Sequence, residues 1–502
     1  MLKKLLQNNI IKSSAGLLII TLLVKMLGYA EKLVLAYYYG TSYRVDVYTV
    51  ILTIVLSLFY FFREVVEPGF LNVFLEAKSK GDESGAWHLF NKGIRIILAI
   101  TIPVALLAFL FPESIMNVFA PGFEGDKWVL SVKLLQIAVP AFIFLALSTL
   151  TSITLNGMKL FVLPASGELA FKGFILIGIV VFYRELGIVG AIIGIIAGSI
   201  GRLGIHLVKL YDKISFRKTS VDKSYAKKAW MLTWPLLLGV SFSQVSSLTD
   251  NIFASYLQEG AIAALSYAKK VVELPIIIFP YVLSIVVFPY FSQLAIEKQQ
   301  EKLKKLLADS LKWIVIAFLP IASFFFIYST SIIEIIFQHG AFDRTSTLLT
   351  STPLMVYSLG MVFFAIETIL VIFYYANADA KTPVFVGIGC VLLHIVLTWI
   401  FIGWIGYIGI AIAFVIQKTV KNLILLGLLK NKITFDVKKI RNFLLKIAFP
   451  VIIFTLVIFF SKTFMDNLSN MGLLIKMTYM GTSFVVGSSI YLIGLRFAGV
   501  FK

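Results

Sequence analysis

The sequence PVFVGIGCVLLHIVLTWIFI fills residues 383–402 and contains no Asp, Glu, Lys or Arg. About twenty apolar residues in a helix are long enough to cross the hydrocarbon core of a bilayer. The rest of the chain has the same character, because hydrophobic residues make up 59% of its 502 residues and charged residues only 14%. A soluble globular protein carries about 25% charged residues. We therefore expect an integral membrane protein without a separate soluble domain.

Thirteen further apolar segments of helical length accompany this one. They are 15–39, 46–63, 93–111, 128–152, 161–183, 187–210, 229–256, 263–291, 311–337, 352–376, 406–429, 443–461 and 472–495. The pattern predicts an all-α polytopic membrane protein with about fourteen transmembrane helices.

Lys and Arg outnumber Asp and Glu by 45 to 26, which gives a net charge of +19. The basic residues gather in the connections after spans 2, 6, 8 and 12, whereas the connections at 257–260 and 403–405 contain none. Positively charged loops stay in the cytoplasm, so both termini are predicted to be cytoplasmic. This explanation also removes the need for a nucleic-acid partner. The single cysteine, Cys390, excludes intrachain disulfides and cysteine-based metal sites.

Three short patterns and one proline recur at a nearly constant offset. EKLVLA at 31–36 parallels DNIFA at 250–254, FAPGF at 119–123 parallels FQHGAF at 337–342, and GIVGA at 187–191 parallels GYIGI at 406–410. The spacing is 218 or 219 residues, and Pro164 and Pro383 share it. An even number of spans separates the equivalents, which predicts two parallel repeats of six helices and a site between them.

The repeats define the expected domains. They are an N-terminal lobe at 1–212 (spans 1–6), a basic cytoplasmic linker at 213–228, a C-terminal lobe at 229–432 (spans 7–12), and spans 13 and 14 at 433–502.

Ionisable side chains lie inside several of the expected spans. An isolated charge there costs a few kcal/mol, so such residues usually face a bundle interior or an aqueous cavity. Repeat-related spans 1, 2, 7 and 8 hold Lys25, Glu31, Lys32, Asp46, Arg63, Asp250, Lys269, Lys270 and Glu273. We predict a central polar cavity in which Lys25, Arg63 and Lys270 contact an anionic ligand. The structural alternative is ion pairing between helices, or along one helix as in the i,i+3 pair Lys270–Glu273.

Spans 5 and 6 contribute weaker candidates and a packing motif. Lys172 and Glu168 are i,i+4 neighbours, and Arg202 is expected to extend its guanidinium towards the cytoplasmic side. The glycines at 190, 194 and 198 have the small-xxx-small spacing that lets two helices approach closely.

Familiar catalytic motifs are missing from the sequence. It has no phosphate-binding GxxxxGK[ST] loop, no HExxH and no GxSxG. We therefore expect a transporter without a cofactor and not an enzyme, with energy supplied by gradients or by the substrate itself.

Several motifs together resemble a known family over nearly the whole chain. They are LGYA at 27–30, Asp46, Arg63 followed by EPGFLNVF at 67–74, APGF at 120–123, YAKKVVELP at 267–275, FQHGAF at 337–342 and ADAKTP at 378–383. The chain resembles the lipid II flippases of the MurJ (MviN) family, within the multidrug/oligosaccharidyl-lipid/polysaccharide exporter superfamily, which includes the MATE-like fold.

The resemblance implies export of an undecaprenyl-diphosphate-linked cell-wall precursor across a bacterial cytoplasmic membrane by alternating access. It also implies a basic central cavity for the diphosphate-sugar, a groove in the last two spans for the lipid tail, and contacts with membrane lipids and cell-wall synthesis proteins. For substrate contact the candidates are Lys25, Glu31, Lys32, Asp46, Arg63 and Lys270. For coupling or gating they are Asp46, Asp250, Lys269 and Glu273, with Na⁺ or H⁺ as the open choice of ion.

This chain departs from the family at charged positions. Lys25 and Lys270 stand where the family usually has arginine, and Glu31-Lys32 stands where it has an Arg-Asp pair. Lysine lacks the planar fork of arginine that suits a diphosphate. A flippase for another polyprenyl-linked oligosaccharide, a cation-coupled small-molecule (multidrug) antiporter and a non-transporting scaffold for cell-wall enzymes are the alternatives. The net cationic set of candidates argues against an exporter of organic cations, and the retained charges argue against a scaffold.

Overall fold

The computed structural model describes residues 9–215, 225, 227–231, 233, 245, 248–429, 437–467 and 472–500. These residues are nearly all helical, and no strand occurs among them, which confirms the all-α prediction. Within this described part, eleven helices are long and apolar enough to cross a membrane. Half of the predicted span 229–256 lies outside the described residues, so the count of fourteen stays a prediction.

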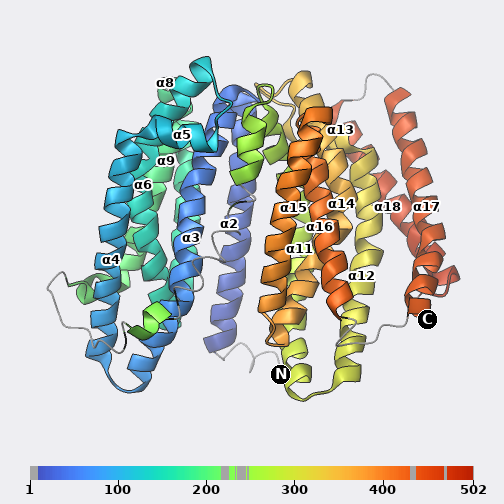
Figure 1. The fold of residues 1–502 in the computed structure, drawn as a ribbon. Helices are drawn as coiled ribbons and strands as arrows, with labels where there is room; N and C mark the ends of the chain where they lie inside the picture. The colour runs from blue at the N-terminus through green and yellow to red at the C-terminus, as the bar shows by residue number, and fades with distance from the viewer. Residues whose placement is uncertain are drawn as a thin grey trace. The chain divides into compact units, whose positions relative to one another are not determined.

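The chain forms two compact units, Met1–Ala263 and Ala264–Lys502. The helices of unit 1 are α2 (Asn9–Tyr39), α3 (Tyr43–Ser79), α4 (Glu83–Leu110), α5 (Pro112–Phe119), α6 (Gly125–Gly157), α7 (Val162–Val181), α8 (Tyr183–Leu186), α9 (Val189–Leu210) and the 3-10 turn η1 (Tyr211–Lys213) (Figure 1). Helix α11 (Ala261–Ile296) begins in unit 1 and continues into unit 2.

Unit 2 contains the remaining helices. They are α12 (Gln300–Ile327), α13 (Ser329–Phe337), α14 (Arg344–Ala376), α15 (Lys381–Ile405), α16 (Ile408–Leu429), α17 (Val437–Asn467) and α18 (Leu473–Phe497). The predicted lobes at 1–212 and 229–432 and the linker at 213–228 stay predictions.

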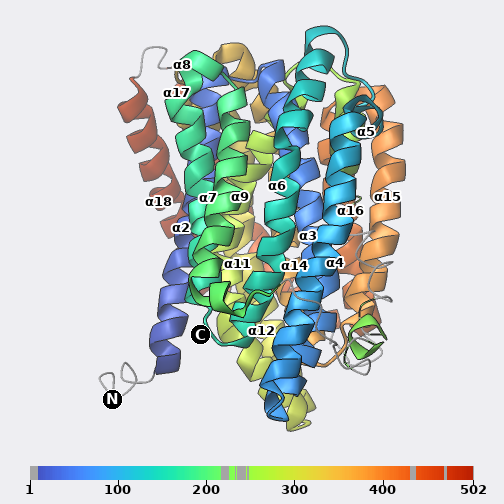
Figure 2. The same ribbon diagram turned by 90° about the vertical axis from the view of Figure 1, so that its left-hand side faces the viewer.

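Helix α6 is the centre of unit 1, where it packs against α3, α4 and α9. Figure 2 shows α4, α6, α9 and α7 side by side. The core between α3, α4 and α6 is made by large apolar side chains such as Phe74, Phe90 and Leu150, each fully buried. Where such side chains lie in the bilayer, they stabilise the fold by close van der Waals packing, because lipid tails are as apolar as the core.

The glycine motif of α9, predicted to serve close helix packing, lies in the contact with α7. A Cβ added at Gly194 would lie 2.7 Å from the carbonyl oxygen of Phe174, and one at Gly198 would lie 2.7 Å from that of Phe171. The same is true in the other direction, because a Cβ on Gly178 would lie 2.5 Å from the Gly190 carbonyl oxygen. The two backbones touch because neither helix carries a side chain there.

In unit 2, α14 packs against α12 and α16, and α15 packs against α16. The last two helices, α17 and α18, pack against each other, and α17 also contacts α12. The Tyr491 hydroxyl of α18 donates a hydrogen bond to the Ile316 carbonyl of α12, at 2.9 Å.

The predicted repeat is present in the secondary structure. Helices α14 and α16 begin and end 219 residues after α6 and α9, and the short α13 follows α12 as the short α5 follows α4. Backbone angles repeat as well. Gly187 and Gly406 end α8 and α15 at φ 56° and 60° with ψ −136° and −141°. Lys159 and Ala378, also 219 residues apart, both have positive φ.

The helices depart most clearly from the predicted spans at three places. The predicted span 311–337 is interrupted at Tyr328, and Pro112 starts a separate helix, α5, because proline suits the first position of a helix. Helix α3 continues from the predicted end at 63 to Ser79. Hydropathy detects only the part of α3 that suits the bilayer, whereas polar residues extend the helix beyond it.

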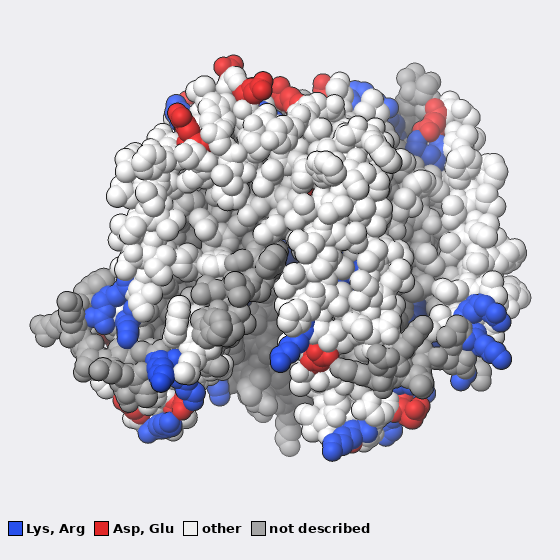
Figure 3. Space-filling model, viewed as in Figure 1, with Lys and Arg blue, Asp and Glu red and all other residues white. Residues whose placement is uncertain are grey.

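Charge is distributed as a membrane requires. In each unit, the middle of the face seen in Figure 3 carries almost no charged side chains, and Lys and Arg gather at the lower helix ends. Large apolar side chains are exposed in both units, among them Leu107 and Phe109 of α4 and Phe459 and Phe460 of α17. The chain is a multi-pass membrane protein.

Candidate functional site: buried charges within each unit

Unit 1 buries a carboxylate between three helices. Glu31 of α2 is fully buried, and its two oxygens accept hydrogen bonds from Lys172 Nζ of α7 at 2.8 Å and from the Tyr48 hydroxyl of α3 at 2.9 Å. The ammonium of Lys32 lies 6.0 Å from the Tyr48 ring centre. A buried carboxylate is costly unless it has a counter-charge and its oxygens accept hydrogen bonds. Lys172 and Tyr48 meet both needs of Glu31. Lys172 thus pairs with Glu31 and not with its i,i+4 neighbour Glu168.

Glu168 instead faces Arg202 of α9. The Arg202 Nη2 lies 4.0 Å from Glu168 Oε2, and the guanidinium stacks over the Phe59 ring at 4.5 Å. Arg202 is only 3% exposed. The expectation that it extends towards the membrane surface was wrong, because the cation–π contact and the carboxylate hold it inside the unit.

Asp46 joins the first turns of two repeat-related helices. Its fully buried carboxylate accepts hydrogen bonds from the backbone N–H groups of Gly260 and Ala263 and from Lys127 Nζ, each at 2.8 Å. Gly260 directly precedes α11 and Ala263 lies in its first turn, where backbone N–H groups have no partner within the helix. A carboxylate beside a helix N-terminus also interacts favourably with the helix dipole.

The capping is reciprocal. Glu259, which precedes α11, accepts a hydrogen bond from the backbone N–H of Tyr43 at the start of α3, at 2.8 Å. Each of the two helices therefore receives a cap from a carboxylate of the other. We call Asp46, Lys127 and Glu259, with the backbone groups they bind, the cross-cap. Separating the two first turns would break the three hydrogen bonds that join them, from Gly260 and Ala263 to Asp46 and from Tyr43 to Glu259.

Unit 2 contains a cavity of about 480 Å³. Its charged lining residues are Lys269, Glu273, Glu367 and Lys418, and aromatic side chains of α14 and α16, Tyr357, Phe364 and Phe414, complete the wall. The Lys269 ammonium lies 4.2 Å from the centre of the Phe414 ring. A concave site with an apolar wall and a few converging charges is the usual form of a small-molecule or headgroup site.

Two lysines of α16 share one carboxylate at this cavity. Glu367 of α14 is paired with Lys418 Nζ at 2.8 Å and with Lys421 Nζ at 2.6 Å. Two cations against one anion leave a net positive charge among these three groups. The sequence prediction missed this cluster, although a carboxylate inside 352–376 and two lysines inside 406–429 were a visible signal.

The other predicted residues lie in varied surroundings. Lys270 pairs with Glu273 at 3.2 Å, as the i,i+3 spacing indicated, and Arg63 Nε lies 3.5 Å from Glu67 in a half-exposed pair. Lys25 is exposed on α2, and Asp250 is half-buried. In the described residues, no group of three or more His, Cys, Asp and Glu side chains lies close enough together to hold a metal ion.

The family model described as lipid II flippase MurJ matches residues 35–479, which include the cross-cap and the cavity of unit 2. This chain belongs to the MurJ lipid II flippase family. The MurJ match begins before α3 and ends within α18, so it covers both units.

Relatives within the MurJ family are distant in sequence but similar in length. A probable lipid II flippase MurJ of Buchnera aphidicola (Schizaphis graminum) is 26% identical over 98% of this chain and 97% of that protein. The lipid II flippase MurJ of Burkholderia cenocepacia is 24% identical over 82% of each chain.

Solved structures give the same result. A lipid II flippase MurJ in an inward closed conformation matches with a TM-score of 0.78 and 26% identity, over 96% of this chain and 99% of that one. An inward-facing multidrug resistance MATE transporter matches with a TM-score of 0.69 and 13% identity, over 80% and 92%. The second likeness concerns the fold alone, and it confirms the predicted MATE-like architecture.

Proposed function

We propose that this chain moves lipid II, an undecaprenyl-diphosphate-linked cell-wall precursor, from the inner to the outer leaflet of a bacterial cytoplasmic membrane by alternating access. The observation that carries the proposal is the match to the lipid II flippase family over residues 35–479. The proposed orientation places both termini in the cytoplasm, in agreement with the basic connections.

The charges of the molecule suit such a substrate. A diphosphate carries at least two negative charges, and lysine or arginine at the edge of an apolar cavity can hold it while the sugars contact polar side chains. The cavity of unit 2 has lysines from two helices, and Arg63, Lys25 and Lys270 are the further cationic candidates. Asp46 is a gating candidate, because the cross-cap must break if the first turns of α3 and α11 part during transport.

The membrane potential supplies a driving force. Moving one elementary charge outward through 100 mV changes its free energy by roughly 2.3 kcal/mol, and the headgroup carries more than one negative charge. Export from a cell that is negative inside is therefore favourable. A gradient of Na⁺ or H⁺ is a further source of energy, for which Asp46, Asp250 and Glu273 are the carboxylates to test, with Lys269 beside them.

A second candidate substrate is another polyprenyl-linked oligosaccharide. Lys25 and Lys270 stand where the family's usual residue is arginine, and a lysine ammonium is a point charge without a bidentate fork. Replacing arginine by lysine changes how a diphosphate and its first sugar are held. A polyprenyl-linked oligosaccharide with another headgroup could then be carried by the same transport cycle.

Complementation tests the proposal. A bacterium is depleted of its essential lipid II flippase, this chain is expressed, and growth is scored together with lipid II exposed at the outer leaflet. We expect rescue that is lost in Asp46→Ala, Arg63→Ala and Lys270→Ala, with normal membrane abundance of each variant. No rescue at normal abundance would favour the other oligosaccharide. Rescue by all three variants would contradict the assignment of these residues.

A further inference from the structure

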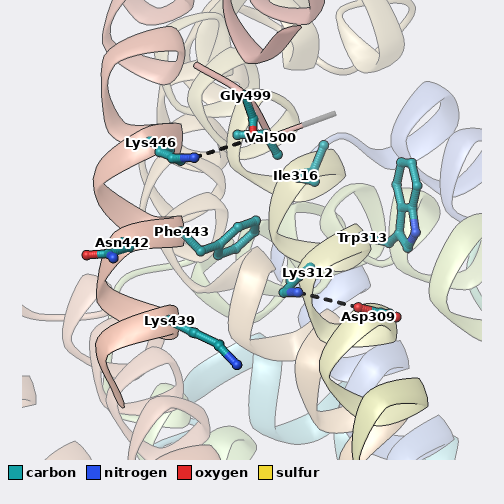
Figure 4. Close-up of a pocket in the computed structure, with 10 residues that line it drawn as sticks. All are labelled: Asp309, Lys312, Trp313, Ile316, Lys439, Asn442, Phe443, Lys446, Gly499 and Val500. Carbon is teal, nitrogen blue, oxygen red and sulfur yellow. Dashed lines mark hydrogen bonds and ion pairs between the residues drawn. The ribbon is translucent and has the colours of Figure 1, made fainter. Parts of the chain in front are cut away.

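A second cavity lies in unit 2, away from the cavity described above. Its volume is about 440 Å³, and it is enclosed by the first half of α12, the first half of α17 and the turn that follows α18 (Figure 4). Its lining residues are Asp309, Lys312, Trp313, Ile316, Lys439, Asn442, Phe443, Lys446, Gly499 and Val500. We call it the α12–α17 pocket.

The pocket has an excess of positive charge. Three lysines and one aspartate line it, and Figure 4 shows the ammoniums of Lys312, Lys439 and Lys446 on different sides of the same space. The Lys312 Nζ lies 3.4 Å from Asp309 Oδ1, and Lys446 Nζ lies 3.4 Å from the Gly499 carbonyl oxygen. Both contacts are long, and each uses one of the three N–H donors of an ammonium. An anion in the pocket can therefore accept further hydrogen bonds.

The wall of the pocket is apolar and aromatic. Trp313 is 52% exposed, and the Phe443 ring lies 5.9 Å from the Lys312 ammonium. Exposed apolar side chains continue along α17 from the pocket, with Leu445 at 65% and Phe449 at 67% exposure. A ligand that fits both parts has a charged head and long apolar chains.

The position along the helices agrees with a membrane interface. The pocket lies near the starts of α12 and α17, where Lys304, Lys305, Lys438 and Arg441 also occur. Figure 3 shows basic side chains at the lower ends of these helices. Lysine-rich connections lie on the cytoplasmic side, tryptophan is enriched at membrane interfaces, and the cytoplasmic leaflet is rich in anionic lipids.

We propose that the α12–α17 pocket binds the phosphate headgroup of an anionic phospholipid of the cytoplasmic leaflet, such as phosphatidylglycerol, with its acyl chains along α17. The lysines, which donate up to three hydrogen bonds each, contact the phosphate. The site is distinct from the charged residues assigned to transport, and the proposal does not depend on which saccharide is carried.

Binding is measured on the full chain purified in detergent, by native mass spectrometry and by the shift of the unfolding temperature on adding lipid. The probes are phosphatidylglycerol, phosphatidylcholine, undecaprenyl phosphate and inorganic phosphate. We expect phosphatidylglycerol to bind at least about tenfold more tightly than phosphatidylcholine, because the lysines attract its net negative charge and phosphatidylcholine has none. Equal binding of both phospholipids, or binding of undecaprenyl phosphate alone, would overturn the proposal. Equal protection by inorganic phosphate would reduce the pocket to a simple anion site and overturn the lipid assignment.

Variants locate the site. The double variant Lys439→Gln/Lys446→Gln removes two charges from the pocket and is expected to lower the affinity for phosphatidylglycerol about tenfold or more. Its control, Lys438→Gln/Arg441→Gln, removes two charges from the same stretch of α17 outside the pocket lining and should change the affinity less than threefold. Equal losses in the two would contradict a defined pocket.

A gain of affinity gives a test that does not depend on loss of structure. Asp309→Asn removes the acidic residue of the pocket lining and leaves Lys312 to the ligand, so phosphatidylglycerol should bind several-fold more tightly. Weaker or unchanged binding in this variant, at an unchanged unfolding temperature without lipid, would contradict the proposal.

Discussion

Single residues inside the bilayer are held by partners far away in the sequence. Glu31 meets Lys172, and Glu367 meets Lys421, over 141 and 54 residues. The sequence indicated that charges in spans must be paired or must line a cavity, but it could not indicate which ones pair. For Lys172 the local rule favoured Glu168, and the tertiary packing of α2 against α7 placed Glu31 nearer.

Glu31→Gln is expected to lower stability by about 3–5 kcal/mol, because it leaves the largely buried ammonium of Lys172 without its counter-charge. The measurement is the unfolding temperature of the detergent-purified protein. The exchange Glu31→Lys/Lys172→Glu keeps one charge of each sign and should recover part of the loss. If the double variant is no more stable than Glu31→Gln, the ion pair does not stabilise the contact between α2 and α7.

Asp46→Ala is expected to abolish transport while the protein remains in the membrane. The change removes three hydrogen bonds from the cross-cap at once and leaves Lys127 largely buried without a carboxylate. Lipid II exposure at the outer leaflet is the readout. Asp126→Ala removes an exposed carboxylate next to Lys127 in the sequence and serves as the control, which should export normally.

At the scale of elements, helix contacts depend on backbone proximity and on caps. A close helix contact of α9 was visible in the sequence as glycines spaced by four, because small residues allow this approach, but its partner α7 was not. The division of one predicted span into α12 and α13 was not visible, since no proline or glycine marks Tyr328. The repeat offers the better guide there, because α5 occupies the equivalent place after α4.

Gly194→Ala is expected to destabilise the protein by about 1–3 kcal/mol, because the new Cβ meets the backbone of α7, which cannot move aside alone. Gly204→Ala in the same helix has open space around the added Cβ and should be neutral or stabilising by up to about 1 kcal/mol. Thermal unfolding of the two variants in parallel checks the difference. Equal effects would mean that the close approach contributes nothing.

The start of α14 gives a pH-dependent prediction. Asp343 accepts a hydrogen bond from the backbone N–H of Ser346 at 2.7 Å, and this bond lowers the pKa of the Asp343 carboxyl from its usual 3.8. A lowered pKa in the folded state means that the cap stabilises α14 above the unfolded pKa and stops doing so as the pH falls through the folded one.

Asp343→Ala should therefore cost about 1 kcal/mol at pH 7, and this difference from wild type should shrink below about pH 4. Unfolding temperatures at pH 7 and pH 3 measure both values. Asp343→Asn keeps a hydrogen-bond acceptor without a titrating charge. The stability difference between the Asp343→Asn and Asp343→Ala variants should therefore not change with pH. A pH-independent difference for wild type would contradict the role of the carboxylate.

At the scale of the whole molecule, the proposed export of a negatively charged headgroup is expected to respond to the membrane potential. Two charges moved through 100 mV correspond to roughly 4.6 kcal/mol, more than a thousandfold in an equilibrium. Collapse of the potential with valinomycin and potassium should therefore lower lipid II export strongly. Nigericin with potassium, which dissipates the proton gradient while the potential remains, is the control. Export that stops only with nigericin would point instead to proton coupling, with Asp46, Asp250 and Glu273 as the first variants to examine.

The sequence by itself determined the membrane character, most helix positions and the repeat, because these depend on local composition and on the chain's own periodicity. It also flagged the charged residues, since any charge in an apolar span is unusual. Only the tertiary structure decided that Asp46 caps another helix, that Glu31 pairs with Lys172, and that Glu367 and two lysines gather at a cavity. Such contacts depend on which helix faces lie together, and each is made between residues whose separation along the chain no local pattern encodes.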